Sequence, residues 1–192
     1  MTTLVFDSTA LNHFAKAGRL TELGVIVEGY HCVAPAEVFA ELTKAVAEYP
    51  ALGTISAQGW LGSVELGEIA EIVAFAQYKH ELGGGSDRNV GESAVLAWVA
   101  VNGGIAIIDE AAATSIGDRD RLAIRGSMWL VIRGYKEGKL DRPTSEEIVD
   151  DLIDSGMWLP VARPFSRGLT RKVCCHRTIS PTIMNSGYRV PG

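Results

Sequence analysis

The chain has 192 residues, of which 47% are hydrophobic and 21% are charged, a balance typical of a folded globular protein rather than a disordered one. No apolar run reaches the roughly 18 residues that a membrane-spanning helix needs, and the N-terminus lacks the pattern of a secretory signal. Three cysteines do not make a disulfide framework. We therefore expect a cytoplasmic protein without a membrane segment.

The net charge of −5 is divided unevenly along the chain. All 23 acidic residues precede residue 161, so residues 1–160 carry a net charge of −11 and residues 161–192 carry +6. An acidic body repels a polyanion unless metal ions screen its carboxylates, whereas a basic tail attracts one, more weakly as salt rises. We expect one domain over residues 1–160 and a basic tail over residues 161–192, which is either disordered or an extension of the domain.

Strand-like and helix-like segments alternate along the first half of the chain. Residues 3–6 predict a buried strand, and Ser8 or Thr9 is suited to cap the helix that follows. Residues 30–35 predict a second strand, with Pro35 at the first position of a helix over residues 36–49. Residues 60–66 predict a short third strand, followed by an amphipathic helix over residues 67–82.

The same alternation continues after a glycine-rich loop at residues 83–89. Residues 91–104 predict an alanine-rich helix that ends in glycines, and residues 105–109, IAIID, predict a strand buried on both faces. A short fifth strand is predicted at residues 121–126, then helices over residues 127–140 and 144–156, the last opened by a Thr-x-x-Glu capping box. The pattern favours an α/β fold with a parallel sheet covered by helices on both faces.

Four acidic residues are predicted to meet at one rim of this sheet. Asp7 and Asp109 each follow an apolar strand, and in open α/β sheets ligands bind at the carboxyl ends of the strands. Glu41 lies less than two turns into one helix, and Glu92 is the second residue of another. Singly, each acid is explained as a cap, a turn residue or a solvated side chain. Together they repel one another, since two charges ~4 Å apart cost roughly 4 kcal/mol at an effective dielectric of ~20.

Such a group of acids either holds protons or is neutralised by a cation. Oxygen ligands without a nearby histidine favour Mg²⁺ or Mn²⁺ over zinc. These ions polarise a phosphodiester, activate water and stabilise the leaving oxygen. The pattern therefore predicts metal-assisted hydrolysis of a phosphodiester.

Several segments also resemble a known family. LVFDSTALNHFAK, VAPAEVFAEL, NVGESAVLAWVA and IAIIDEAAA are similar to the motifs of PIN-domain proteins, above all the branch that contains VapC-type toxins of toxin–antitoxin pairs. RGSMWLVIRGYKEGKL and LIDSGMWL resemble the closing helices of that branch, so the resemblance covers about residues 3–159. It implies a three-layer α/β/α sandwich with a central parallel sheet, and a Mg²⁺- or Mn²⁺-dependent endoribonuclease that hydrolyses RNA.

The resemblance also assigns roles to individual residues. It implies a metal-binding and catalytic set of four acids, Asp7, Glu41, Glu92 and Asp109. Thr9 is the favoured hydroxyl to orient Asp7 or a metal-bound water, with Ser8 as the alternative. The implied partners are RNA as substrate, a cognate antitoxin that occupies or distorts the site, and a second copy of the chain in a homodimer.

One departure from the family pattern leaves alternatives open. Relatives often carry an arginine a few residues after the fourth acid, where this chain has Ala112 and Ala113. Asp118 and Asp120 either supply a further acid or lie in a surface loop. Glu110 either replaces a neighbouring acid, faces solvent or caps its helix. The alternative function is a catalytically silent PIN-like module that binds nucleic acid or protein. An aspartate-nucleophile phosphatase is disfavoured because it needs an acid where Thr9 stands.

Overall fold

The computed structural model describes residues 1–83 and 88–159. The predicted basic tail at residues 161–192 lies outside the described residues, as does part of the predicted glycine-rich loop. The described strands are β1 (Thr3–Phe6), β2 (His31–Pro35), β3 (Leu61–Val64), β4 (Ile105–Ile107) and β5 (Ile124–Arg125). The described helices are α1 (Ser8–Lys16), α2 (Leu20–Ile26), α3 (Ala36–Ala45), α4 (Ile69–Leu82), α5 (Val90–Asn102), α6 (Ala111–Arg119), α7 (Ser127–Lys136) and α8 (Arg142–Asp154), with a 3₁₀ helix η1 (Pro50–Ala57).

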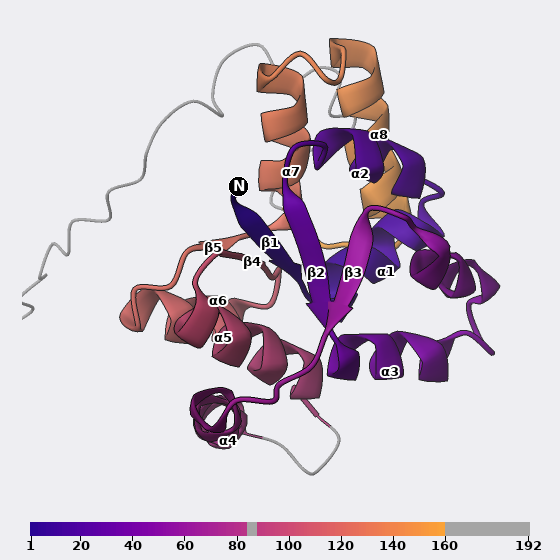
Figure 1. The fold of residues 1–192 in the computed structure, drawn as a ribbon. Helices are drawn as coiled ribbons and strands as arrows, with labels where there is room; N and C mark the ends of the chain where they lie inside the picture. Colours follow the sequence, from indigo (N-terminus) through magenta and orange to yellow (C-terminus); the bar gives the residue numbers. More distant parts are fainter. Residues whose placement is uncertain (84–87, 160–192) are drawn as a thin grey trace, which may run out of the picture.

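The five strands form one parallel sheet in the order β3-β2-β1-β4-β5 (Figure 1). β1 occupies the centre, where Leu4 pairs with Cys32 of β2 on one side and with Ile105 of β4 on the other. All strands point the same way, so the ends of β1, β2 and β4 open onto one rim. The expected parallel sheet is confirmed.

Helices cover both faces of the sheet, which gives the expected three-layer α/β/α sandwich (Figure 1). α5 packs directly against β1, β2 and β4, with α4 and α6 beside it. On the other face, α1 contacts α2 and α8, and α2 contacts α7. α3 contacts both α1 and α5. The first turns of α1, α3 and α5 therefore meet next to the carboxyl ends of the central strands.

The central strand is buried because its side chains are apolar on both faces. Leu4, Val5 and Phe6 are completely inaccessible to solvent, as expected for a strand between two helical layers. Phe6 also packs against the indole ring of Trp60, with the ring centroids 5.8 Å apart. Within the described part of the chain, no helix is long and apolar enough to cross a membrane.

Two details of the helices differ from the sequence prediction. The N-cap of α8 is Asp141, whose side chain accepts a hydrogen bond from the Thr144 amide at 2.8 Å, so the predicted capping box at Thr144 is wrong. Three further segments, α2, η1 and α6, are helical although the sequence pattern did not single them out. They are short, and packing against the larger helices stabilises them more than their own apolar periodicity does.

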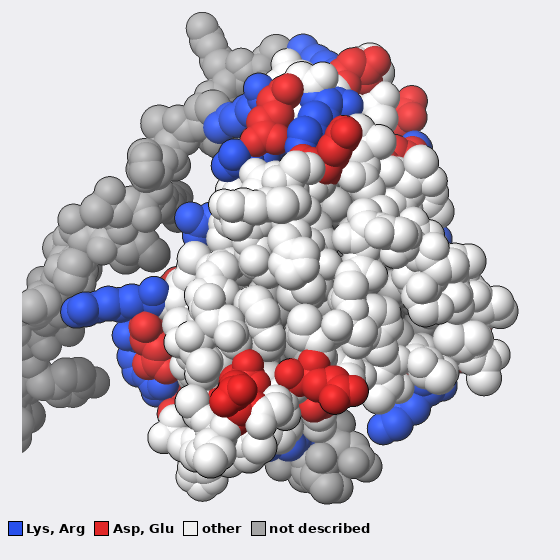
Figure 2. Space-filling model, viewed as in Figure 1, with Lys and Arg blue, Asp and Glu red and all other residues white. Residues whose placement is uncertain are grey.

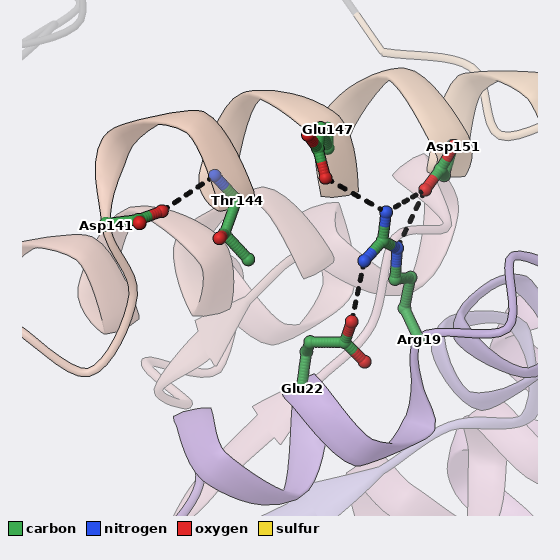
Figure 3. Close-up of polar contacts among 6 residues, drawn as sticks. All are labelled: Arg19, Glu22, Asp141, Thr144, Glu147 and Asp151. Carbon is green, nitrogen blue, oxygen red and sulfur yellow. Dashed lines mark hydrogen bonds and ion pairs between the residues drawn. The ribbon is translucent and has the colours of Figure 1, made fainter.

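Arg19, the residue before α2, joins that helix to the C-terminal helix α8 (Figure 3). Its Nε donates to Oδ2 of Asp151 at 2.7 Å, and its Nη1 donates to Oε1 of Glu22 at 2.6 Å. Its Nη2 lies 3.5 Å from Oε2 of Glu147. The guanidinium thus links the start of α2 to two turns of α8. This ion-pair network crosses between segments that are more than 120 residues apart in sequence.

We expect Arg19→Ala to lower the free energy of unfolding by about 1–2 kcal/mol, because partly buried hydrogen bonds between charged groups contribute at about this level. Arg142→Ala is the matched control, since the ion pair of Arg142 with Glu146 lies within one helix and bridges no two elements. Chemical denaturation monitored by circular dichroism measures both changes. Equal effects of the two substitutions would contradict a bridging role for Arg19.

Candidate active site

Asp7 lies at the end of the central strand and is completely buried. It is itself the N-cap of α1: its Oδ2 accepts a hydrogen bond from the Thr9 amide at 3.0 Å. The prediction that Ser8 or Thr9 caps this helix is therefore wrong. Within the described chain, the other carboxylate oxygen, Oδ1, is buried and has no hydrogen-bond partner. A buried carboxylate oxygen without a partner is costly, so this atom is the first mark of a functional site.

Glu41 connects three helices around Asp7. Its Oε2 accepts a hydrogen bond from the Ser8 hydroxyl at 2.8 Å, and its Oε1 accepts one from the Gly91 amide at 2.8 Å. The carboxylate of α3 is thus fixed between the first turn of α1 and the first turn of α5. Of the two hydroxyl residues considered from the sequence, Ser8 donates its hydroxyl to Glu41. Burial raises the pKa of Asp7, and hydrogen bonds from the amide and the side chain of Thr9 act against this and lower it.

The missing side chain of Gly91 leaves room for two carboxylate oxygens. A Cβ built at Gly91 would lie 2.7 Å from Oε2 of Glu41 and 3.3 Å from Oδ1 of Asp7. Both oxygens therefore converge on one point beside the α5 backbone. Any larger residue at position 91 has to displace Glu41, because 2.7 Å is shorter than real contacts to a Cβ.

Glu92 is the third residue of α5, which begins at Val90 rather than one residue later as predicted. Burial raises the pKa of its carboxyl, and the charges of Glu41 and Glu110 raise that pKa further. Lys79 of α4 acts in the opposite direction and lowers it. Glu92 in turn affects the central acid: burial is the main cause that raises the pKa of Asp7 to about 7, and the charge of Glu92 is the second. Asp7, Glu41 and Glu92 therefore lie close enough for their charges to repel one another: the charge of Glu41 acts on Glu92, and the charge of Glu92 acts on Asp7.

Asp109 has a different environment from the other three predicted acids. It lies two residues beyond the end of β4, and its Oδ1 and Oδ2 accept hydrogen bonds from the amide and the hydroxyl of Ser127, at 2.9 and 2.7 Å. Ser127 is the first residue of α7, so Asp109 satisfies the start of that helix. Its charge also raises the pKa of His13 on α1, against the larger lowering effect of burial.

Glu110 is the acid that the sequence prediction undervalued. It occupies the N-cap position of α6, and its side chain makes no capping bond to any described residue. Of the two structural roles expected for it, exposure to solvent is confirmed and side-chain capping is not. It is exposed, and its charge contributes to the raised pKa of Glu92. The sequence signal for it was only its position next to Asp109. Asp118 and Asp120 lie at the far end of α6 and are exposed, with Asp120 paired to Arg119 at 2.7 Å.

A family model described as a PIN domain matches residues 3–163, most of the chain. The chain belongs to the PIN-domain family. No curated protein and no solved structure is significantly similar to it. PIN domains bind nucleic acids and are generally metal-dependent nucleases, so membership points to a nuclease-type function.

The acids of this PIN domain are of the type that binds a hard cation, but the described residues do not form a complete set of metal ligands. The buried Oδ1 of Asp7, without a partner among the described residues, and Oε2 of Glu41 both border the space that a Cβ of Gly91 would fill. Oxygen ligands of this kind suit Mg²⁺ and Mn²⁺. Across residues 1–83 and 88–159, however, no group of three or more Asp, Glu, His or Cys side chains is positioned to hold a metal ion. Two carboxylates converge, Glu92 is close enough to affect their charge, and Asp109 is bonded to Ser127.

In metal-free buffer we expect Asp7→Asn to raise the free energy of unfolding at pH 8 and to change it little near pH 4. The pKa of Asp7 rises from 3.8 to about 7 on folding, so the native state keeps a proton that the unfolded chain releases. The stability of the wild type therefore falls as the pH rises from about 4 to 7. At ~1.4 kcal/mol for each pH unit of that window, the gain from Asp7→Asn approaches about 4 kcal/mol at pH 8.

The matched control is Asp141→Asn, the same change at the exposed N-cap of α8. Hydrogen bonds from Thr144 lower the pKa of Asp141, so this variant is expected to be slightly less stable than the wild type at pH 8. Asparagine is as good an N-cap as aspartate, so both variants keep their helices. Urea denaturation in the presence of EDTA at several pH values measures whether each substitution raises or lowers the free energy of unfolding. The same pH dependence for both variants would contradict the burial of an unneutralised carboxyl at Asp7.

Proposed function

We propose that this PIN domain is a divalent-metal-dependent endoribonuclease whose ion is held by Asp7, Glu41, Glu92 and Asp109. The observation that supports it best is the buried Oδ1 of Asp7, which has no partner among the described residues and which borders, with Oε2 of Glu41, the space that a Cβ of Gly91 would fill. A cation at this point would stabilise the ionised form of Asp7, and it would thereby offset the desolvation and the repulsion by Glu92 that raise the pKa of this carboxyl. The basis for choosing Mg²⁺ or Mn²⁺ is the all-oxygen donor set.

The mechanism follows from how the chain holds these acids. A bound Mg²⁺ or Mn²⁺ ion supplies Lewis-acid polarisation of the phosphodiester and a nucleophilic water at neutral pH. Asp7 is oriented by its capping bond to the Thr9 amide, and the Thr9 hydroxyl is the group we assign to hold Asp7 or a water. Ser8 and the Gly91 amide fix both oxygens of Glu41. Preorganised acids of this kind need little rearrangement during the reaction.

Asp109 remains in the proposed set as the fourth acid. An ionised carboxylate offers about four lone-pair positions, and the two bonds from Ser127 occupy only two of them. Ser127 would therefore act as the group that orients Asp109 rather than as a competitor for it.

We further propose that the chain is the toxin of a type II toxin–antitoxin pair and forms a homodimer. The support is the resemblance of its motifs to VapC-type proteins, including the closing helices α7 and α8. An antitoxin would then inhibit the enzyme by occupying or distorting the acidic rim. The basic tail at residues 161–192, which lies outside the described residues, carries the charge needed to attract RNA toward an otherwise acidic body.

A silent PIN-like module that binds nucleic acid or protein is the second candidate. It is favoured by the absence of a three-ligand metal group among the described residues and by Ala112 and Ala113, which stand where relatives often have an arginine. Calorimetry with Mn²⁺ separates the candidates, because a silent module has no reason to bind the ion at millimolar concentration.

We expect Asp7→Asn and Glu41→Gln each to reduce Mg²⁺- or Mn²⁺-dependent RNA cleavage by at least ~100-fold, since loss of even an outer-shell partner costs 10–100-fold. EDTA is expected to abolish cleavage by the wild type. Asp118→Asn, an exposed acid on α6, is the matched control and should retain wild-type activity. Because Asp7→Asn is expected to fold at least as stably as the wild type, undiminished cleavage by this variant would contradict the proposal directly.

We expect Gly91→Ala to weaken Mn²⁺ binding by about 10–100-fold while the fold is kept, because the new Cβ would displace Oε2 of Glu41. Gly53→Ala is the control, since its Cβ would meet only the Val46 side chain at an ordinary 3.7 Å. Isothermal titration with Mn²⁺ measures both variants. Wild-type affinity in Gly91→Ala would show that Glu41 does not hold the ion.

A further inference from the structure

The segment that follows α8 carries an exposed tryptophan. Trp158 is 84% exposed, whereas the other three tryptophans of the chain, Trp60, Trp98 and Trp129, are half-buried. Between residues 142 and 159, all of which the structure describes, Trp158 is also the one large hydrophobic side chain that is exposed. Tryptophan combines a wide apolar ring with a hydrogen-bond donor, and it is therefore enriched at binding surfaces. This ring is consequently a candidate contact for a ligand.

The backbone that carries Trp158 is fixed by the end of α8. Gly156, at a φ of 94°, and Met157 donate their amides to carbonyls in the last turn of α8, at 3.0 and 3.1 Å. These two bonds and the positive φ form a Schellman motif, which ends a helix in a defined direction. Met157 is buried and Leu159 packs against the core, so both neighbours of Trp158 are anchored. The ring is therefore presented to solvent from a rigid support.

Hydrogen bonds between the α1 and α8 segments lead towards the acidic rim, the strand-end edge that carries the four proposed metal ligands. Arg19, shortly after α1, bonds Asp151 of α8 at 2.7 Å (Figure 3). His13, within α1, bonds the hydroxyl of Ser155 at 2.8 Å. Moving back along α1 therefore means moving forward along α8, so the two segments are antiparallel. His13 lies one helical turn after Thr9, on the same side of α1. The chain beyond Ser155 thus continues in the direction of Thr9 and the first turn of α1.

Electrostatics gives the same position for this end of α8. Burial lowers the pKa of His13, and the charge of Asp109 acts in the opposite direction. The hydrogen-bonded pair of His13 and Ser155 is therefore near one of the four acids. Trp158 comes three residues after Ser155, so their Cα atoms are at most about 11 Å apart. The exposed ring consequently lies beside the acidic rim, on its Asp109 side.

RNA near this rim needs contacts that do not depend on its charge. Residues 1–160 carry a net charge of −11, and Ala112 and Ala113 stand where relatives often have an arginine. On the face shown in Figure 2, Lys and Arg side chains lie near the border of the molecule, and at the top of the view they are mixed with acids. The described body therefore offers little net attraction for phosphates. Stacking of a base on an aromatic ring adds roughly 5- to 100-fold in affinity without any charge.

We propose that the indole ring of Trp158 is a stacking platform for one base of the RNA substrate, beside the acidic rim. The inference rests on the proposed nuclease function and adds a residue that positions the strand. A single exposed ring suits one planar base, because every base has a π-face that can stack. A protein partner would instead need a contiguous apolar surface, and no other large hydrophobic side chain is exposed in the described stretch from residue 142 to residue 159.

The test is binding of a short single-stranded RNA, an oligoadenylate, to the full-length chain, measured by fluorescence anisotropy. EDTA is present so that the RNA stays intact. Trp158→Ala is expected to weaken binding by roughly 5- to 100-fold, while Trp158→Phe, which keeps an aromatic ring, loses less. Tyr135→Ala is the matched control: Tyr135 is a 45% exposed aromatic residue on α7, and its substitution should leave the affinity unchanged.

Two further measurements distinguish stacking from other roles of Trp158. An abasic oligomer of the same length offers the same phosphates without bases, so wild type and Trp158→Ala should bind it equally. The salt dependence of RNA binding should keep its slope in Trp158→Ala, because the substitution removes no charge. Circular dichroism and urea denaturation are expected to show a folded variant of unchanged stability, since the side chain is exposed.

Wild-type RNA affinity in Trp158→Ala, an equal loss of affinity for the abasic oligomer, or no RNA binding by the wild type would overturn the proposal. A change of mass in sedimentation together with unchanged RNA binding would also overturn it, and would assign Trp158 to a protein interface. RNA binding that depends on Trp158, without any Mg²⁺-dependent cleavage, would contradict the nuclease function and leave this contact standing.

Discussion

The burial of the Asp7 carboxyl is the constraint around which this PIN domain is arranged. The central strand is apolar and inaccessible from Leu4 to Phe6, and it ends at an acid that water does not reach. One oxygen of that acid starts the first helix by accepting the Thr9 amide, and the other has no described partner. An uncompensated carboxylate in such a place is destabilising, so the carboxyl either keeps its proton or receives a cation. The raised pKa of Asp7 is the first of these outcomes, and the proposed metal is the second.

The surrounding bonds show how the fold keeps the acids close in spite of their repulsion. Glu41 is held on both oxygens, by Ser8 from α1 and by the amide of Gly91 from α5. The N-terminus of α5 directs positive partial charge toward the same place, which favours a negative side chain there. The glycine matters for its lack of volume, since Asp7 and Glu41 share the space that a Cβ would fill. The helix N-terminus, the hydrogen bonds and the small size of Gly91 therefore all act on the carboxylate of Glu41.

Much of this arrangement was predictable from the sequence, but the contacts were not. The three central strands, β1, β2 and β4, were recognised because each is a short and mainly apolar run next to a helical pattern. Strands that run in parallel then bring Asp7, Glu41 and Glu92 to one rim. The capping of α1 was misassigned because Asp, Ser and Thr stand side by side, and each is a good N-cap. The bonding of Asp109 to Ser127 joins residues 18 positions apart in different elements, and composition gives no signal for it. The exposure of Ile69, Ile72 and Val73 on α4 was hidden for a related reason: apolar residues lie on both faces of that helix, and only the structure shows which face α5 covers.

α4 contacts both the core and the acidic rim. Its inner side carries Tyr78 against the core, and Lys79 lowers the pKa of Glu92 at the acidic rim. The ammonium group of Lys79 thus offsets part of the charge of Glu92. The proton on Asp7 and a divalent ion at the rim would compete for the same buried oxygen. Each would therefore weaken the binding of the other to the same extent, because linkage between two equilibria is reciprocal.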